Sequence, residues 1–140
     1  MKNIVYVSTA VTLMHENQLF DILHNSRLHN EALGITGILL YSEGTFIQVL
    51  EGKDNIINAL YARIKADQRH KDVVTLIDEP ISEKSFAKWL MGFAITDKVK
   101  TEKLVGYLRS VKELDLNTGN GAAVSAIKDF IETNELDVKY

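Results

Sequence analysis

Hydrophobic residues recur along the chain with two different periods, and the succession of these periods predicts the order of the elements. Short apolar runs rich in β-branched residues, which are typical of strands, cover residues 4–7, 35–41, 45–50, 73–77 and 87–96. Apolar residues spaced as on one face of a helix occupy residues 16–30 and then the stretch that follows the third strand. The predicted order is therefore βαββαββ.

This order predicts an α+β, ferredoxin-like sandwich. Each amphipathic helix needs an apolar surface to cover, so we expect a five-stranded mixed sheet with both helices on one face. Two further helical patterns, at residues 99–114 and 122–134, are separated by residues 117–121. These C-terminal helices are expected to cover either the other face of the sheet or a partner.

Punctuating residues predict where several elements end. Gly34 is expected to stop the first helix, and residues 42–44 to form a tight hairpin turn. Pro80 is expected in the turn after the fourth strand. Trp89 and Met91 are expected on one face of the fifth strand, where the simplest interpretation is a core pair.

The second helix carries a carboxylate in its apolar stripe. Asp54 or Asn55 is expected to cap this helix. The stripe comprises Ile56, Ile57, Leu60, Tyr61 and Ile64. Asp67 falls on the same face, and burial near a helix C-terminus disfavours a carboxylate both by desolvation and by the helix dipole. Either the helix ends before Asp67 and the residue is solvated, or Arg63 pairs with it at i,i+4, or a ligand lies beside it.

Three more polar residues occupy positions that the pattern marks as apolar. On a helical wheel Asn30 falls near the centre of the apolar arc of the first helix, and Gln48 shares a strand face with Phe46 and Leu50. Tyr6 lies in the first strand. Taken singly, each has a simpler explanation. Gln48 could lie on an edge strand that is exposed to water on one side, and Tyr6 could be an ordinary core tyrosine. Together with the carboxylate of the second helix, they describe a slot for a flat ligand with polar edges.

Composition narrows the classes of function. The 140 residues are 46% hydrophobic and 25% charged, which is typical of one globular domain, and the net charge of -3 without a basic block argues against nucleic acid binding. The absence of cysteine excludes disulfides, thiolate nucleophiles and cysteine-ligated zinc. Without an N-terminal apolar region or a run of about 18 apolar residues, we expect a cytoplasmic protein that does not enter a membrane.

Motifs of catalysis and metal binding are missing from the sequence. The four histidines show no metal-binding spacing, so no metal site is predicted. The glycines of residues 34–37 have neither the spacing nor the helix of a dinucleotide or phosphate-binding loop, and there is no Gly-x-Ser-x-Gly elbow. We therefore do not expect an enzyme.

Several segments of the chain nevertheless stand in a distinctive order and spacing. They are YVS at residues 6–8, Asn30, GITGILLY at 34–41, FIQVLEG at 46–52, RIKADQRH at 63–70 and FAKWLM at 86–91. In this order they closely resemble the BLUF family of blue-light sensors that use FAD, over about residues 2–95. The resemblance implies a photosensory, FAD-binding domain at residues 1–96 and a C-terminal helical extension of the same compact unit at residues 97–140.

The resemblance also implies which residues bind the cofactor. These are Ser8, Asn30, Gln48, Arg63, Asp67, Arg69 and His70. Asn30 would bond the carbonyl edge of the flavin ring, and Arg63 and Asp67 would bond its pyrimidine side. Arg69 and His70 would lie near the ribityl or phosphate chain.

By the same resemblance, light would act through Tyr6 and Gln48. Tyr6 would donate an electron and then a proton to the excited flavin, with Gln48 as the relay between them. The Gln48 amide would be left rotated or tautomerised, and a new hydrogen bond to the flavin carbonyl would shift absorption to the red. Trp89 and Met91 would carry the change to the C-terminal helices. Since no cysteine is present, a cysteinyl–flavin adduct is excluded.

The output is expected to leave through self-association, as in a homo-oligomer, or through a separate downstream signalling protein. Two other functions compete with this interpretation. One is a ferredoxin-like module that binds a small metabolite and regulates without photochemistry. The other is a small flavin enzyme, which would need an acid or base that the sequence does not identify.

Overall fold

The structure, a computed structural model, describes residues 1–113 and 121–139 and confirms the predicted βαββαββ order followed by two helices. The strands are β1 (Lys2–Ala10), β2 (Thr36–Ser42), β3 (Thr45–Gly52), β4 (His70–Pro80) and β5 (Gly92–Ile95). The helices are α1 (Glu16–Leu33), α2 (Asp54–Ala66), α3 (Lys98–Glu113) and α4 (Ala122–Thr133).

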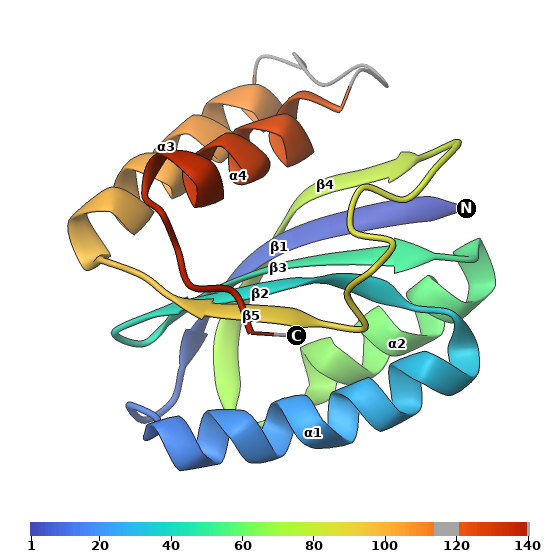
Figure 1. Ribbon diagram of the computed structural model, residues 1–140, viewed down its shortest axis with the longest axis horizontal. Coiled ribbons are helices and arrows are strands. Elements are labelled where there is room, and N and C mark those ends of the chain that lie inside the picture. The colour runs from blue at the N-terminus through green and yellow to red at the C-terminus, as the bar shows by residue number, and fades with distance from the viewer. Residues whose placement is uncertain (114–120, 140) are drawn as a thin grey trace.

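The five strands form one mixed sheet in the order β4-β1-β3-β2-β5. β2 and β5 run parallel, whereas the other neighbouring strands are antiparallel. Figure 1 shows α1 and α2 on one face of this sheet and α3 and α4 on the other. Of the two expectations for the C-terminal helices, the structure therefore shows that they cover the second sheet face.

Strand alternation divides the core into two layers, and β3 in the middle of the sheet shows how. Phe46 and Leu50 belong to the apolar cluster that α1 and α2 complete, while Ile47 and Val49 belong to the cluster completed by α3 and α4. Successive side chains of a strand point to opposite faces, so Gln48 faces the α1 and α2 layer. The shared face predicted for Phe46, Gln48 and Leu50 is confirmed.

Element ends agree with the predictions in part. Gly34 ends α1 in the left-handed conformation, with a φ of 68°, as expected of a glycine stop. The cap predicted for α2 is wrong, because Lys53 is the N-cap and Asp54 is already the first helical residue. Pro80 is the last residue of β4, and not part of the following turn. Leu114, the predicted last residue of the third helix, and most of the separator at 117–121 lie outside the described residues.

The fifth strand is much shorter than the predicted stretch of residues 87–96. It spans only Gly92–Ile95, so Trp89 and Met91 lie in the loop that precedes it. They do not share a face: Met91 belongs to the cluster beneath α1 and α2, whereas Trp89 packs against the cluster beneath α3 and α4. Outside the ladder, alternation no longer decides where a side chain points.

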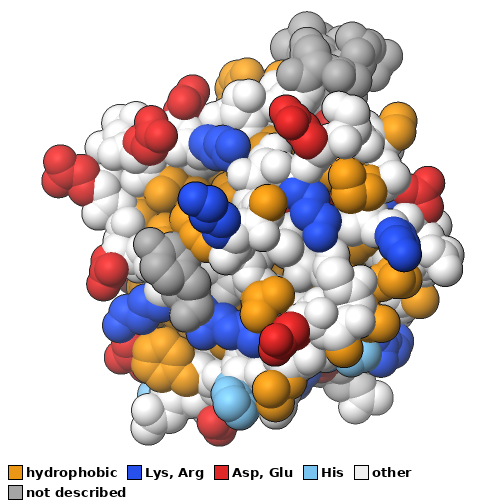
Figure 2. Space-filling model, turned by 45° about the vertical axis from the view of Figure 1, so that its right-hand side comes forward, with side chains coloured by type: hydrophobic (Ala, Val, Ile, Leu, Met, Phe, Trp, Pro, Cys, Tyr) orange, Lys and Arg blue, Asp and Glu red, His pale blue; other side chains and the backbone are white. Residues whose placement is uncertain are grey.

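The surface carries charged side chains of both signs, which are interspersed with apolar ones on the face in Figure 2. In the part of the chain that the structure describes, no helix combines the length and the apolar character that crossing a bilayer requires.

Gly37 in β2 offers a test of how closely the sheet and the loop are packed. A Cβ at this position would lie 1.9 Å from the Val49 carbonyl oxygen and 3.5 Å from Met91 Cε. We expect Gly37→Ala to lower the free energy of unfolding by at least about 2 kcal/mol, because backbone atoms would have to move. Urea unfolding measures this.

The matched control is Gly106→Ala in α3, where an added Cβ meets nothing within 4 Å. An alanine in a helix interior stabilises relative to glycine by about 0.5–1 kcal/mol, so this variant is expected to be at least as stable as the parent. Equal stabilities of the two variants would contradict the packing described for β2.

Candidate functional site

A cavity of about 350 Å³ opens between α1, α2 and the sheet. Its volume lies in the range of about 300–1,000 Å³ that is typical of pockets for small molecules. The side chains around it come from α1, α2, the strands β1 to β4 and the loops before α1, β4 and β5. They are Tyr6, Met14, Ile22, Leu23, Asn25, Ser26, His29, Asn30, Leu39, Phe46, Gln48, Leu50, Leu60, Arg63, Ile64, Asp67, Arg69, His70 and Met91.

Gln48 lies on the sheet floor of the cavity between two partners. Tyr6 and Gln48 are directly opposite each other in the β1–β3 pairing, and the Tyr6 hydroxyl donates to Gln48 Oε1. On its other side, Gln48 Nε2 donates to Met91 Sδ at 3.3 Å. The Gln48 side chain is nearly buried, and so are both partners. The expectation that Gln48 lies on a wet edge strand is therefore wrong, because β3 is the central strand.

The two hydrogen bonds of the Gln48 amide differ in strength. A phenol is a good donor to an amide oxygen, whereas a thioether sulfur is only a weak acceptor. The Nε2 group therefore gives up little when it leaves Met91 for a better acceptor. A ligand carbonyl in the cavity is such an acceptor, so the amide can respond to what the cavity holds.

Burial holds the Tyr6 phenol in its neutral form. Desolvation is the largest cause that raises the pKa of Tyr6 far above its usual value, and the nearby Tyr61 and Asp67 raise this pKa further. The ring of Tyr61 lies 5.4 Å from the ring of Tyr6. Tyr6 therefore keeps its proton over the whole physiological pH range.

Asn30 places a second buried amide at the cavity. Its side chain is 2% exposed, as its position in the apolar stripe of α1 predicts. The Asn30 Nδ2 group donates to the Leu90 carbonyl oxygen at 2.6 Å, in the loop that also carries Met91. Asn30 thus lies between the helix, the cavity and this loop.

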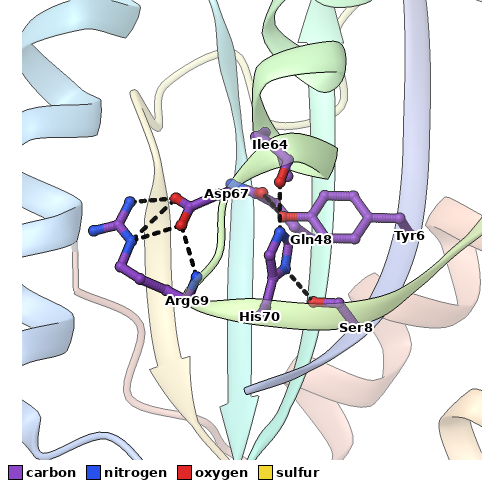
Figure 3. A network of polar contacts seen from close by, with 7 residues as sticks. All are labelled: Tyr6, Ser8, Gln48, Ile64, Asp67, Arg69 and His70. Atoms are coloured by element: carbon purple, nitrogen blue, oxygen red, sulfur yellow. Dashed lines mark hydrogen bonds and ion pairs between the residues drawn. The ribbon is translucent and has the colours of Figure 1, made fainter. Parts of the chain in front are cut away.

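Asp67 ends α2 and pairs with a residue that the sequence analysis did not pair with it. The helix ends at Ala66, and Asp67 is its C-cap in extended conformation. Arg69 donates to both Asp67 carboxylate oxygens, and the closest contact joins Nη2 and Oδ2 at 2.5 Å (Figure 3). The hydrogen bond from the Arg69 side chain is the main cause that lowers the pKa of Asp67.

The alternative that paired Arg63 with Asp67 is wrong. Arg63 reaches across from α2 to α1 instead, where its Nη2 lies 2.5 Å from His29 Nε2. Both residues line the cavity. The helix end before Asp67 that the other alternative predicted is confirmed, but the carboxylate is partly buried and paired with Arg69 instead of simply solvated.

His70 joins the end of α2 to the sheet. Its Nδ1 lies 2.8 Å from Ser8 Oγ and its Nε2 lies 2.5 Å from the Ile64 carbonyl oxygen (Figure 3). Ser8 is buried and is not among the residues that line the cavity. Six of the seven predicted cofactor-binding residues therefore line the cavity: Asn30, Gln48, Arg63, Asp67, Arg69 and His70. Ser8 does not line it and contacts His70 instead.

Glu51 holds the loop between β4 and β5 in place. This fully buried carboxylate accepts from the backbone N–H groups of Ser85 and Phe86 at 2.9 and 2.6 Å and from Thr36 Oγ1 at 2.9 Å. Trp89 follows in the same loop and stacks on Phe86, with ring centroids 5.4 Å apart. The loop is anchored to the sheet on one side of Met91 by these contacts.

Several cavity residues were not predicted as site residues. Asn25, Ser26 and His29 line the cavity from α1. Ser26 already falls in the apolar arc of the helical wheel, and this was the signal that could have identified it. Among residues 1–113 and 121–139, no group of three or more His, Cys, Asp or Glu side chains is placed to hold a metal ion.

The arrangement agrees with a known family. Residues 1–92 match the family described as BLUF, sensors of blue-light using FAD. The chain belongs to the BLUF family. As BLUF domains bind flavin and sense blue light, this BLUF chain is a flavin-binding photosensor module.

Curated relatives of this BLUF chain are much longer. The photoactivated adenylate cyclase subunit beta of Euglena longa is 39% identical over 103 residues, which are 72% of this chain and 12% of the relative. The photoactivated adenylate cyclase subunit alpha of Euglena gracilis is 32% identical over 101 residues, 71% of this chain and 10% of the relative. The BLUF chain thus spans about a tenth of the length of these relatives.

Two solved structures resemble the BLUF chain over nearly its whole length. The dark-state structure of BlrB, a BLUF protein, is 29% identical with a TM-score of 0.68, and the match covers 94% of this chain and 95% of that one. BlsA in its ground state is 26% identical with a TM-score of 0.69, over 93% and 87% of the two chains. The α+β fold with its C-terminal helices is therefore shared with these proteins.

The cavity of the BLUF chain suits a flavin ring. Apolar side chains such as Leu23, Leu39 and Ile64 offer walls for a flat aromatic system. The buried amides of Asn30 and Gln48 offer donors and acceptors for a ring edge that carries both carbonyl and N–H groups. The cavity thus combines apolar walls with polar amides, as the sequence pattern suggests.

The raised pKa of Tyr6 can be tested on flavin-free protein. Exposed tyrosines ionise near pH 10, with a rise in phenolate absorbance. We expect Tyr6→Phe to leave this rise unchanged, because the buried phenol of Tyr6 keeps its proton at that pH. Spectrophotometric titration of the folded parent and variant measures this.

The sign of the accompanying stability effect follows from linkage. Because the pKa of Tyr6 is higher in the folded than in the unfolded state, its contribution to stability is complete below the unfolded pKa and is lost as pH rises from there toward the folded pKa. Tyr6→Phe is therefore expected to flatten the alkaline loss of stability. A smaller phenolate rise near pH 10 in Tyr6→Phe would contradict the buried, neutral phenol.

Proposed function

We propose that this chain is a blue-light photoreceptor that binds FAD non-covalently in the cavity between α1 and α2 and signals through Tyr6 and Gln48. The observation that carries the proposal is the placement of the Gln48 amide. It lies on the cavity floor between a buried phenol and a weakly accepting thioether. An amide held in this way can leave its weak acceptor for a better one that the cavity supplies, which gives it the second arrangement that a switch requires.

In this proposal, seven residues hold the cofactor. They are Ser8, Asn30, Gln48, Arg63, Asp67, Arg69 and His70. Asn30 and Gln48 meet the ring edges with their amides, and Arg63 and Asp67 meet its pyrimidine side. Arg69 and His70 lie toward the ribityl or phosphate chain, and Ser8 acts by orienting the His70 ring through Nδ1.

The bound flavin supplies the absorption of blue light and, once excited, the oxidising power. Tyr6 is the reductant: it holds its proton in the dark and gives up an electron and then that proton. Gln48 accepts the hydrogen bond of the Tyr6 hydroxyl through Oε1 and relays the proton. The electron and the proton then return to Tyr6, and the amide is left rotated or tautomerised, with the Nε2 bond to Met91 exchanged for one to a stronger acceptor.

From Gln48 the change passes to the loop before β5. Met91 senses the amide directly, and Trp89 lies two residues earlier against the layer of the C-terminal helices. We propose that residues 1–96 form the sensor and that residues 97–140 form an extension within the same compact unit. The signal leaves this unit by self-association or through a separate signalling protein, and the unit itself is a sensor without catalytic activity of its own.

The first test is the absorption spectrum of the purified protein before and after blue light. We expect a bound flavin, identified as FAD after release by denaturation, and a reversible red shift. Tyr6→Phe and Gln48→Leu are expected to keep the yellow colour and to lose the normal shift, because they remove the donor and the amide of the switch.

The matched control is Tyr41→Phe, another buried tyrosine, whose hydroxyl accepts from the Met14 N–H at 3.2 Å and whose ring does not line the cavity. It is expected to keep the full shift. A normal shift in Tyr6→Phe would refute the assigned role of the phenol. A colourless protein that binds no added flavin would refute the proposed function and favour a regulatory module for a small metabolite.

The second test is the affinity for FAD. Removing the Asn30 amide leaves ring polar atoms without a partner, at about 1–3 kcal/mol. We expect Asn30→Ala to raise the dissociation constant for FAD roughly 5- to 150-fold. Fluorescence titration of flavin-free protein with FAD, FMN and riboflavin measures this and ranks the three flavins.

Asn58→Ala is the matched control for this titration. Asn58 lies on α2 outside the cavity and contacts Lys2 through its side chain at 2.8 Å. Its replacement is expected to leave the affinity unchanged. Equal affinities of the parent and Asn30→Ala for FAD would contradict the proposed contact between the Asn30 amide and the flavin ring.

A further inference from the structure

The last described residues of the chain extend the sheet beyond β5. After α4 the chain returns to lie beside β5, as the red C-terminal segment in Figure 1 shows. Phe93 and Lys139 form an antiparallel bridge in which each N–H donates to the other carbonyl oxygen at 2.8 Å. Val138 packs closely against Gly92, where an added Cβ would lie 3.1 Å from Val138 Cγ1. We call residues 138–139 the tail.

One guanidinium group joins this tail to the cavity loop. Arg27 on α1 donates to the Met91 carbonyl oxygen from Nε at 3.0 Å and from Nη2 at 2.8 Å. The same Nη2 donates to the Lys139 carbonyl oxygen at 2.7 Å. The planar fork of an arginine allows this bridging, which a lysine ammonium on a flexible stem does not reproduce.

Met91 therefore connects Arg27 with the switch. Its carbonyl oxygen accepts from Arg27, and its sulfur accepts from Gln48 Nε2 at 3.3 Å. The rest of the Met91 side chain is buried in the core beneath α1 and α2. Met91 and the guanidinium of Arg27 thus link the Gln48 amide to the tail.

We propose that Arg27 is a positioning residue that couples docking of the tail on β5 to the hydrogen-bond state of Gln48. The proposal rests on the proposed function, because it takes Gln48 as the residue that light changes. Coupling is reciprocal: if release of Nε2 from Met91 loosens the tail, then loss of the tail must disfavour the Met91 arrangement seen in this structure. The tail also covers the outer edge of β5, which its release opens for pairing.

The experiment uses the full chain loaded with FAD and compares five proteins. These are the parent, Arg27→Gln, a chain that ends at Asp137, the double variant, and the control Arg109→Gln. Arg109 is an exposed arginine in the C-terminal half of α3 and does not line the cavity. For each, the red shift, its recovery rate in the dark, and hydrogen exchange of the tail in darkness and under blue light are measured.

We expect Arg27→Gln and the shortened chain to keep FAD and the red shift. We expect them to slow dark recovery about fivefold or more, taking the weaker end of typical coupling free energies to act fully on the recovery barrier. The double variant is expected to be no slower than either single variant, because both break one link. In the parent, light should speed exchange at the tail, and in Arg27→Gln the tail should exchange fast in darkness as well. Arg109→Gln should behave as the parent.

The outcomes separate this proposal from the proposed function. If the parent shows the red shift but both variants recover within twofold of its rate, the coupling is overturned and the photoreceptor stands. The coupling is also overturned if the slowing of recovery in the double variant equals the product of the slowing in the two single variants. Such a product shows two independent effects. If the parent shows no flavin or no red shift, the proposed function itself fails and takes the coupling with it. Should Arg27→Gln not fold, the shortened chain decides alone through its recovery rate.

Discussion

The site depends on one buried amide in the centre of the sheet. Strand alternation in β3 turns Gln48 toward α1 and α2, where the neighbouring positions of the same face hold Phe46 and Leu50. A buried amide without partners costs free energy, so the surrounding structure has to supply a donor and an acceptor. The opposite residue of β1 supplies the phenol, and the loop before β5 supplies the sulfur. The cavity lies between these residues on the sheet and the helices α1 and α2.

Supplying the acceptor from a loop has a physical consequence. If Met91 were part of a strand, its displacement would break a ladder of backbone hydrogen bonds. Because β5 begins only at Gly92, Met91 can shift while the sheet stays paired. The loop is nevertheless held on both sides of Met91, since buried Glu51 binds the backbone at Ser85 and Phe86 and Gly92 continues into the sheet. A short segment with fixed ends can take a few discrete arrangements, which suits a relay better than a mobile loop does.

Local patterns predicted the fold and part of the candidate site, and non-local contacts account for what they missed. Periodicity predicted the order of the strands and helices among the described residues, and polar residues in apolar stripes pointed to Asn30 and Gln48. The apolar stretch of residues 87–96 misled the prediction, because Trp89, Leu90 and Met91 have the composition of a strand although they lie in a partly exposed loop. The partner of Asp67 was wrong because i,i+4 pairing presumes a helix that had already ended. The link from Arg27 to Lys139 joins a side chain to a backbone carbonyl 112 residues further along the chain, which side-chain patterns do not record.

The burial of Tyr6 constrains how any electron could leave it. The same desolvation that raises the pKa of its phenol disfavours every charged form of the side chain, and a tyrosine that loses an electron alone becomes a cation. In this interior the loss of an electron therefore favours the loss of the proton as well. The hydroxyl donates to Gln48 Oε1, so the proton's path begins at the amide. An oxidation of Tyr6 consequently cannot leave the Gln48 hydrogen bonds unchanged, and under the proposed function this is how absorbed light becomes a structural change.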